Sequence, residues 1–254
     1  MTASRSDLPT VAVVTGASRG LGAGLAEALA AASIQLGLCA RQRPSVPGGA
    51  DAVADEVDVS DVEAITAFAD RVVERFGRID LWINNAGILE PIGALSEAEP
   101  ALVRRHLEIN VGGVLYGSAA FARHVRRRPG GGVLVNISSG AATTPYQGWA
   151  VYCAAKAAVA MASEVTALDE AAHGLRVYAL APGVVDTDMQ AQVRTTSAEV
   201  MPAVERFRAI ERQGAFNSPR WVAAFILGHC WGASRSTSSR EDPVRVRVPD
   251  EHPG

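Results

Sequence analysis

Short apolar runs and longer amphipathic stretches alternate along most of the chain. The apolar runs are rich in β-branched residues and stop at polar residues, glycine or proline, which is typical of buried parallel strands. We expect such strands at residues 10–15, 34–40, 52–59, 79–83, 132–137 and 175–180, and an edge strand at 244–248. Strands that alternate with helices predict an α/β fold: a single doubly wound parallel sheet of about seven strands with helices on both faces.

Polar residues, glycines and prolines mark where the expected helices begin and end. Asp61 can cap a helix that runs to about residue 76, and Gly77 ends it. Gly174 ends the long alanine-rich helix that begins after Gly148. Residues 44–49 contain two prolines and two glycines, so the crossover helix at this point is expected to be very short or absent.

The last third of the chain departs from the regular alternation. Residues 185–215 are long and mixed in polarity without strand character, which predicts a lid over a substrate crevice. Ser218 and Pro219 begin an expected amphipathic helix that turns Trp221, Phe225 and Leu227 to the core. Residues 232–242 are rich in serine and arginine and are predicted to be mobile. No repeat or linker is visible, so residues 1–254 are expected to form one domain with its core at about 10–230.

Composition narrows the classes of function. The chain has 254 residues, 48% of them hydrophobic, and a net charge of −3. It can therefore bury a large core, and it offers no overall field that would attract nucleic acid or an anionic membrane. The run Arg126-Arg127-Arg128 is expected to be a solvated helix end, with phosphate or nucleic-acid binding as the alternative.

The cysteine and histidine side chains indicate no metal site. Three cysteines and five histidines are widely spaced, without a CxxC or HExxH pattern, so a reduced interior without metal is the prediction. The first nine residues lack the apolar run of a signal peptide. We also expect no stretch to be apolar over the thickness of a bilayer. Together these observations predict a cytoplasmic protein with no membrane or nucleic-acid partner.

A glycine-rich turn joins the first expected strand to an alanine-rich helix. It reads Gly16-Ala-Ser-Arg-Gly20-Leu-Gly22. Glycines between a strand and a helix let the backbone approach a pyrophosphate, which binds at the helix N-terminus. The turn therefore predicts a Rossmann-like dinucleotide site. The alternative is a tight turn that binds nothing.

The next two strand ends suggest which dinucleotide binds. The second strand ends in Cys39-Ala40-Arg41-Gln42-Arg43, where a carboxylate would hold the 2′-hydroxyl of NAD. Guanidinium groups match phosphate geometry, so Arg41 and Arg43, with Arg19 from the glycine turn, predict NADP(H). Solvated arginines are the alternative. The third strand ends in Asp58-Val59, placed to meet an adenine edge.

Small and amide side chains follow the fourth strand as Asn84-Asn85-Ala86-Gly87. Such residues at the carboxyl end of a strand fit a ligand crevice, where space is tight and backbone groups need partners. The helical stretch at 97–128 is interrupted near Asn110. Because asparagine is a poor helix former, Asn110 predicts a bent turn with a freed carbonyl. A satisfied core amide is the alternative.

Tyr152 and Lys156 form the strongest chemical pair in the sequence. Their spacing of four residues in a helix places the phenol and the ammonium on one face. A neighbouring cation stabilises a phenolate and lowers the pKa of the phenol. Lys156 is the only lysine among 24 Lys and Arg residues, and its compact ammonium is not interchangeable with a guanidinium. The pair predicts a proton donor, against the alternative of a chance spacing in an amphipathic helix.

Together these motifs resemble the short-chain dehydrogenase/reductase family over about residues 10–230. The resemblance rests on Thr15-Gly-Ala-Ser-Arg-Gly-Leu-Gly22, Asn84-Asn-Ala-Gly87, Asn110, Ser139, Tyr152, Lys156 and Pro182-Gly183, in that order. It implies a catalytic tetrad of Asn110, Ser139, Tyr152 and Lys156. The family spacing of thirteen residues between serine and tyrosine selects Ser139 over Ser138. It further implies a cofactor site made of Gly16, Ser18, Arg19, Gly20, Leu21, Arg41, Asp58, Val59, Asn85, Ala86, Gly87, Tyr152, Lys156, Pro182, Gly183, Val185 and Thr187, with Thr187 on the nicotinamide carboxamide.

Two stretches are similar to the sepiapterin reductase and benzil reductase branch of that family. They are Tyr146-Gln-Gly-Trp-Ala-Val-Tyr-Cys-Ala-Ala-Lys156 and Pro182-Gly-Val-Val-Asp-Thr-Asp-Met-Gln190. This resemblance implies an NADPH-dependent reductase of ketones, often vicinal diketones. The expected substrate wall consists of Ile88, Leu89, Trp149, Val184, Met189 and Gln190, which suits an aromatic or apolar ketone.

Other functions stay open at this stage. The chain is also compatible with a tailoring reductase or alcohol dehydrogenase that acts on an unrelated substrate. A protein that senses NADP without turnover is a further alternative. The family resemblance also implies a homodimer or homotetramer, which forms through the helices that carry Asn110 and Tyr152.

Overall fold

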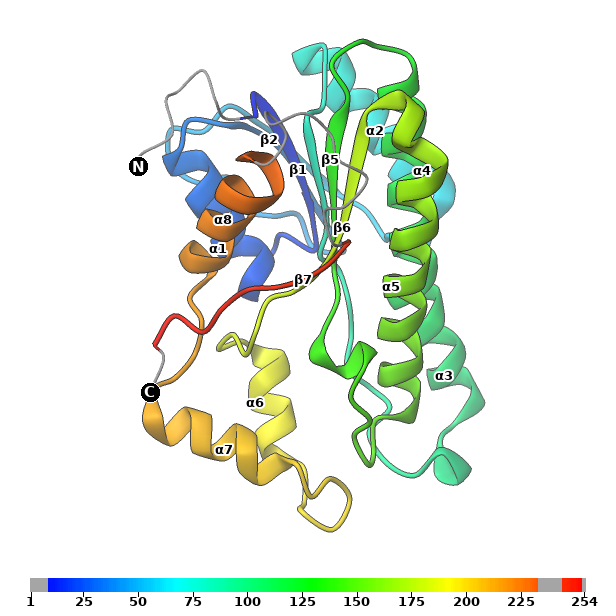
Figure 1. Cartoon of the computed structure of the whole chain (residues 1–254), viewed down its shortest axis with the longest axis vertical. Coiled ribbons are helices and arrows are strands. Elements are labelled where there is room, and N and C mark those ends of the chain that lie inside the picture. The colour runs from blue at the N-terminus through cyan, green and yellow to red at the C-terminus, as the bar shows by residue number, and fades with distance from the viewer. Residues whose placement is uncertain (1–8, 233–243, 253–254) are drawn as a thin grey trace.

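The computed structural model describes residues 9–232 and 244–252 and confirms the predicted α/β architecture (Figure 1). Seven parallel strands form one sheet in the order β3-β2-β1-β4-β5-β6-β7. Their bounds are β1 Val11–Thr15, β2 Gln35–Ala40, β3 Ala52–Glu56, β4 Leu81–Asn84, β5 Gly132–Ile137, β6 Leu175–Ala181 and β7 Arg245–Arg247. The order reverses between β1 and β4, which is where doubly wound sheets bind their ligands.

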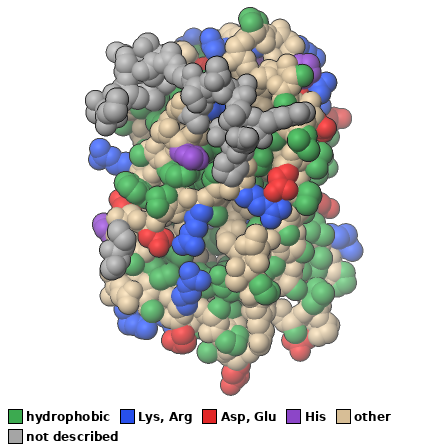
Figure 2. All heavy atoms as spheres, in the orientation of Figure 1, with side chains coloured by type: hydrophobic (Ala, Val, Ile, Leu, Met, Phe, Trp, Pro, Cys, Tyr) green, Lys and Arg blue, Asp and Glu red, His purple; other side chains and the backbone are tan. Residues whose placement is uncertain are grey.

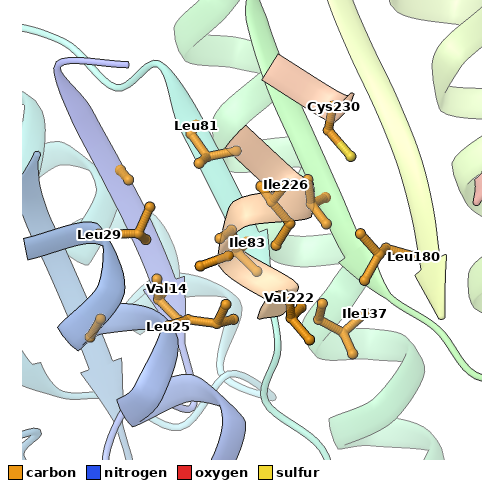
Figure 3. Close-up of a cluster of buried hydrophobic side chains, with 14 of the residues drawn as sticks. Val14, Leu25, Leu29, Leu81, Ile83, Ile137, Leu180, Val222, Ile226 and Cys230 are labelled. Carbon is orange, nitrogen blue, oxygen red and sulfur yellow. The ribbon is translucent and has the colours of Figure 1, made fainter. Parts of the chain in front are cut away.

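Helices cover both faces of the sheet (Figure 1). One face carries α1 (Gly20–Ala31) and α8 (Pro219–Phe225), and the other carries α2 (Val62–Phe76), α4 (Gly113–Arg126) and α5 (Ala150–Glu170). The shorter α3 (Pro100–Leu107) precedes α4, and α6 (Asp188–Thr195) and α7 (Val204–Gln213) lie beyond the carboxyl end of β6. Every residue of β1 and β5 is buried, so an apolar layer lies between the sheet and the helices on each face. Figure 3 shows the layer under α1 and α8, with Leu25, Leu29, Val222 and Ile226 on the strand residues.

The predicted helix ends are confirmed by their geometry. Asp61 accepts hydrogen bonds from the backbone N–H groups of Glu63 and Ala64. Gly77 and Gly174 end their helical segments with φ of 78° and 73°, a left-handed conformation that glycine adopts without strain. Residues 41–51 contain no helix, as the two prolines and two glycines predicted.

Some expected bounds were wrong. β3 ends at Glu56, so Asp58 and Val59 lie in the loop after it. β4 ends one residue later than expected, at Asn84. The stretch expected to be helical from Glu97 begins as a 3₁₀ turn, and α3 starts only at Pro100.

The core face of α8 was also assigned wrongly. The Trp221 side chain is 37% exposed, and its indole N–H donates to the Pro249 carbonyl at 2.9 Å. Val222 and Ile226 are fully buried in its place. Phe225 and Leu227 are only partly buried against this core. The assignment failed because the C-terminal segment that partners Trp221 is remote in sequence.

Helix α5, continued by a 3₁₀ turn to His173, is long and apolar enough to cross a membrane by length and composition, contrary to the expectation. It is a core helix, because Val151, Ala155, Val159 and Ala160 along it are buried in the fold.

The amino ends of β1 and β4 are joined by one buried carboxylate. Asp80 is 1% exposed and accepts from the backbone N–H groups of Thr10 and Val11 and from Arg78 Nε and Arg128 Nη2. The expectation of a solvated arginine run at 126–128 is therefore wrong for Arg128. Arg126 ends α4 with its side chain 49% exposed, as expected of a solvated helix end, and it donates two hydrogen bonds to Glu170. Of the stretch 232–242 that was expected to be mobile, residues 233–242 lie outside the described residues.

Candidate active site

A cavity of about 1070 Å³ opens at the carboxyl ends of the strands. Its wall contains the residues predicted to bind cofactor or substrate, except Arg43, and the predicted Ser139, Tyr152 and Lys156. Asn110 lies behind the wall instead of lining it. Figure 2 shows basic side chains gathered around the middle of the face drawn in Figure 1, above the segment that carries α6 and α7. Because the carboxyl ends of parallel strands lie along one edge of the sheet, motifs that are far apart in sequence meet in one site.

Two glycines of the glycine turn have no room for a side chain. Gly16 has a φ of 67°, and a Cβ there would lie 2.7 Å from Ala86 Cα. A Cβ on Gly22 would lie 2.2 Å from the Gly16 carbonyl oxygen. The backbone of the turn and the N-terminus of α1 are thereby presented to the cavity, which is the arrangement that accepts a pyrophosphate.

Asn84 and Asn85 separate into two different roles. Asn85 donates to the backbone carbonyls of Thr15 and Gly16 at 2.9 and 3.2 Å, and so fixes the start of the glycine turn. Asn84 points away from the crevice and is 2% exposed. It accepts from Trp82 Nε1 at 2.7 Å and donates to Asn136 Oδ1 at 2.8 Å. The expectation that both asparagines face a ligand was therefore wrong for Asn84.

The arginines near the expected adenosine end behave differently from one another. Arg41 lines the cavity at the end of β2, is exposed, and pairs with no carboxylate of residues 9–232 or 244–252. Arg43 is exposed and lies outside the lining residues. Arg19 forms an ion pair with Asp188 at 3.1 Å, so it does not serve the β2 end in this structure.

Asp58 is held by partners that keep it charged. Partial burial raises its pKa, but hydrogen bonds from Ser60 and Arg105 outweigh that effect, so its pKa falls to about 2. Arg105 of α3 reaches it at 2.9 Å. The loop after β3 is thus tied to α3 at the rim of the cavity.

Ser139, Tyr152 and Lys156 converge at one place on the wall. Ser139, which begins a 3₁₀ turn after β5, hydrogen-bonds the Tyr152 hydroxyl. Lys156 lies one turn further along α5 and donates to the Ile137 carbonyl at 2.8 Å. Its ammonium lies over the Tyr152 ring, 5.6 Å from the ring centroid. The helix therefore presents phenol and ammonium on one face, as their spacing predicted.

The electrostatics of the pair differ from the sequence prediction. Burial raises the pKa of Tyr152 to about 12, and the hydrogen bond from Ser139 opposes this only in part. Lys156 is not among the causes of the shift, so the predicted lowering by the ammonium was wrong for this structure. Burial lowers the pKa of Lys156 itself to about 8. At neutral pH the phenol is therefore protonated, as a proton donor must be.

The core-amide alternative for Asn110 is confirmed, and the predicted interruption of the helix lies at the same place. It lies in a π-helical turn, Glu108–Gly112, that bends the path between α3 and α4. Its amide is also a satisfied core group: Oδ1 accepts from Ile88 N–H and Nδ2 donates to the Ile88 carbonyl, both at 2.8 Å. Asn110 thus holds the segment after Gly87 against the helices.

His106 is a buried part of the site that the sequence reasoning missed. Its Nδ1 lies 2.6 Å from the Glu90 carbonyl, so that nitrogen carries the proton. Its Nε2 lies 2.8 Å from Asn110 Nδ2 and accepts from it. The imidazole is therefore neutral, and burial lowers its pKa. Its ring meets Tyr152 edge-on at 6.1 Å. The only hint in the sequence was that His106 precedes Asn110 by four residues, a spacing that places two helical side chains on one face.

The substrate wall is a cluster of aromatic rings from two distant segments. Trp149 lies 5.1 Å from Tyr152, 5.3 Å from Tyr146 and 5.7 Å from Phe207, measured between ring centroids. Leu89, Val193 and Met201 are buried against them. Tyr146 and Phe207 line the cavity but were not expected in the substrate wall, because Phe207 reaches it only through the fold of residues 185–215.

Residues 185–215 cover this end of the cavity as two helices. Thr187 caps α6 by accepting from the Gln190 N–H at 3.3 Å. A Cβ on Gly20 would lie 3.2 Å from Thr187 Cγ2, so the start of α6 abuts the glycine turn. The segment predicted to be a lid is therefore positioned over both expected ligand regions.

Comparison with known proteins identifies the family. The model of the family "short chain dehydrogenase" matches residues 10–198. The chain belongs to the short-chain dehydrogenase/reductase family. The dehydrogenase is 31% identical over 222 residues to "Benzil reductase ((S)-benzoin forming)" of Bacillus subtilis, covering 85% of this chain and 90% of that protein.

Two further relatives show the breadth of this family. "Cis-4-hydroxycyclohexanecarboxylate dehydrogenase" of Sinomonas cyclohexanicum is 37% identical over 203 residues, 76% of this chain and 81% of that protein. Among solved structures, levodione reductase matches with a TM-score of 0.80 and 26% identity, covering 94% of this chain and 95% of that one. The dehydrogenase is therefore an oxidoreductase that acts on alcohol or carbonyl groups.

Proposed function

We propose that this protein is an NADPH-dependent carbonyl reductase that acts on ketones with aromatic or apolar substituents. The observation that carries the proposal is the protonated Tyr152 phenol, hydrogen-bonded to Ser139 and flanked by Lys156, at the wall of the large cavity. A donor placed where negative charge develops on oxygen is what carbonyl reduction requires of the protein.

The residues present fit NADP(H). Gly16, Gly20 and Gly22 line the cavity at the start of α1, and the N-terminus of a helix is where phosphates bind. Arg41 offers a guanidinium without a carboxylate partner in the described chain, at the end of β2. A 2′-phosphate would supply that partner, and we assign Arg41 to it.

Each catalytic residue has a distinct proposed task. When bound, reduced nicotinamide supplies the hydride. Tyr152 donates its proton to the carbonyl oxygen, so that the ketone becomes an alcohol. Ser139 donates a hydrogen bond to the same oxygen. Lys156 holds ribose hydroxyls, while Asn110 supports a water that returns the proton to Tyr152 through Lys156.

The substrate class follows from the wall. Trp149, Tyr146 and Phe207 form an aromatic surface beside Tyr152, which favours a planar, apolar substituent on the carbonyl. The relative named as a benzil reductase supports an aromatic vicinal diketone.

NADPH consumption tests the function directly. The purified chain is mixed with NADPH and benzil, 1-phenyl-1,2-propanedione or sepiapterin, and absorbance of NADPH is followed. We expect turnover with at least one of the aromatic diketones. Absence of turnover with every ketone and every alcohol tested, in both directions, would leave a protein that binds NADP without catalysis.

A ring-alcohol dehydrogenase is the second candidate. The relative "Cis-4-hydroxycyclohexanecarboxylate dehydrogenase" supports it. Oxidation of cyclic alcohols that exceeds reduction of the diketones would favour this function over the first.

Replacing Arg41 tests the cofactor assignment. Arg41→Ala is expected to raise the KM for NADPH by about 10- to 100-fold, because a charged hydrogen-bond partner of the phosphate is lost. The KM for NADH, which lacks that phosphate, is expected to change less than about 3-fold. Equal effects on both cofactors would show that Arg41 serves the fold and not the 2′-phosphate.

Self-association is proposed through α4 and α5. Met161, Val165 and Leu168 form one exposed apolar stripe along α5, with Leu168 74% exposed, and Leu115 is exposed on α4. A second copy of the chain would cover this stripe by symmetric helix packing. Light scattering on the purified chain is expected to give a dimer or tetramer, and Leu168→Glu is expected to shift it to monomer. A wild-type monomer at micromolar concentration would contradict the proposal.

A further inference from the structure

We propose that Arg206 and Tyr146 bind a carboxylate of the substrate, so that preferred substrates are ketones on a ring that carries a carboxylate at its far end. This inference rests on the proposed ketone reduction and specifies which ketones are selected. Both residues line the cavity, and Arg206 donates from Nη1 to the Tyr146 hydroxyl at 3.3 Å.

The charges of the cavity wall leave two guanidinium groups for ligand anions. Five arginines line it: Arg19, Arg41, Arg105, Arg206 and Arg247. Three of them pair with carboxylates: Arg19 with Asp188 at 3.1 Å, Arg105 with Asp58 at 2.9 Å and Arg247 with Asp250 at 3.3 Å. Within residues 9–232 and 244–252, no carboxylate pairs with the other two. Arg41 is at the cofactor end, which leaves Arg206 at the lid end for the substrate.

A row of aromatic rings leads along the cavity wall from Tyr152 to Arg206. From Tyr152 the wall runs to Trp149 and then to Tyr146, in ring-to-ring steps of 5.1 and 5.3 Å. Arg206 lies beyond the second step, on Tyr146. A substrate with its carbonyl at Tyr152 would therefore extend along Trp149 and Tyr146 before it reaches the guanidinium. This spacing favours a para-substituted ring over a short keto acid.

The pair has the donors that a carboxylate needs. Tyr146 accepts from Arg206, which leaves the phenolic O–H free to donate to a ligand oxygen. The remaining guanidinium N–H groups donate to a carboxylate in a planar, two-point arrangement. A hydrogen bond received from a cation also makes the phenol a stronger donor. Arg206 and Tyr146 together therefore form a clamp for a planar anion.

Three acidic residues line the same cavity. Asp58 is paired with Arg105. Asp188 is paired with Arg19, and Glu90 accepts from Gln192 Nε2 at 2.7 Å. Because Glu90 has a neutral partner, its charge opposes an anion, whereas the charge of Arg206 attracts it. The preference of the enzyme for anionic or cationic substrates shows whether Arg206 or Glu90 dominates. A preference for a cationic ring would mean that Glu90 binds the substrate charge.

The experiment compares three acetophenones that differ in the para substituent. With wild-type chain and saturating NADPH, kcat/KM is measured for 4-acetylbenzoate, its methyl ester and unsubstituted acetophenone. We expect the acid to exceed the ester by about 10-fold or more, since a charged hydrogen-bond pair is gained. The methyl ester retains the shape and removes the charge. A cationic comparator, 4-acetylphenyltrimethylammonium, is expected to be the poorest substrate.

Variants separate charge recognition from packing. Arg206→Gln is expected to lower kcat/KM for the acid by about 10- to 100-fold and for the ester by less than about 3-fold. Arg206→Lys restores part of the loss, because it keeps the charge without the planar fork. Tyr146→Phe is expected to reduce the acid about 3- to 10-fold. Arg212→Gln is the matched control, because Arg212 is exposed on the same helix and does not line the cavity.

The outcomes distinguish this inference from the proposed function. Equal kcat/KM for acid and ester in the wild-type chain would overturn the carboxylate site while leaving ketone reduction intact. A loss in Arg206→Gln that is equal for acid and ester would do the same, because it would mean damage to the lid. No reduction of any of the ketones, the diketones included, would remove the proposed function itself.

Discussion

Tyr152→Phe is expected to lower kcat for ketone reduction by about 10²- to 10⁴-fold, the usual contribution of a positioned general acid. The variant keeps the ring that packs on Trp149 and under Lys156, so the fold and the cavity wall are retained. It removes only the hydroxyl that Ser139 contacts. The measurement is steady-state NADPH oxidation, together with the Kd for NADPH from cofactor fluorescence. The Kd is expected to change less than about 3-fold.

Tyr116→Phe is the control for this variant, since Tyr116 lies on α4 away from the cavity lining. Its kcat is expected to equal that of the wild-type chain. If Tyr152→Phe retained wild-type turnover, the proton would have to come from another group, and the assignment of Tyr152 would be abandoned.

The protonation states predict different pH profiles for the two directions of reaction. Burial holds the pKa of Tyr152 at about 12, so the phenol is protonated throughout the neutral range. Reduction needs that proton and is expected to be flat from about pH 6 to pH 8, above which Lys156, with a pKa of about 8, loses its charge. Alcohol oxidation needs the phenolate and is expected to rise with pH. Oxidation that falls as pH rises would contradict this sign.

Asp80→Ala is expected to lower the free energy of unfolding by about 3–5 kcal/mol, since it leaves buried partners uncompensated. Asp80 is 1% exposed and accepts from two backbone N–H groups and from two arginines. Without Asp80, the backbone N–H groups of Thr10 and Val11 lose their hydrogen-bond acceptor, which lowers stability. Urea denaturation followed by circular dichroism measures the change.

Asp55→Ala is the matched control for stability. Asp55 pairs with Arg71 at 2.8 Å, but the Arg71 side chain is 46% exposed, and such surface pairs contribute only about 0–1 kcal/mol. In the folded Asp80→Ala protein, kcat is expected to stay within about 2-fold of wild type at low temperature, because the cavity lies at the opposite end of the strands. A change in stability below about 1 kcal/mol would show that Arg78 and Arg128 do not depend on Asp80.

The parts of the site that the sequence predicted are local in origin. The glycine turn, the spacing of Tyr152 and Lys156, and the caps at Asp61, Gly77 and Gly174 depend on conformations that a few neighbouring residues decide. The resemblance to short-chain dehydrogenases then brought Ser139 and Asn110 into one hypothesis. The structure places Ser139 on the Tyr152 hydroxyl and Asn110 behind the wall.

Several of the errors concern which way a side chain turns toward a remote partner. Asn84 faces Trp82 and Asn136 rather than the crevice, and Trp221 faces Pro249 rather than the core. Arg19 meets Asp188, which is 169 residues away. Periodicity cannot decide such cases, because both orientations satisfy the same local pattern.

The order of strands and helices, the doubly wound sheet and the glycine turn before α1 were determined by the sequence, because hydrophobic period and glycine conformation are properties of short segments. The tertiary structure decided the protonation of Tyr152, the neutral His106 behind Asn110, and the meeting of Arg206 with Tyr146. Desolvation and charge pairing depend on every group that surrounds an atom, and those groups come from segments that only the folded chain brings together.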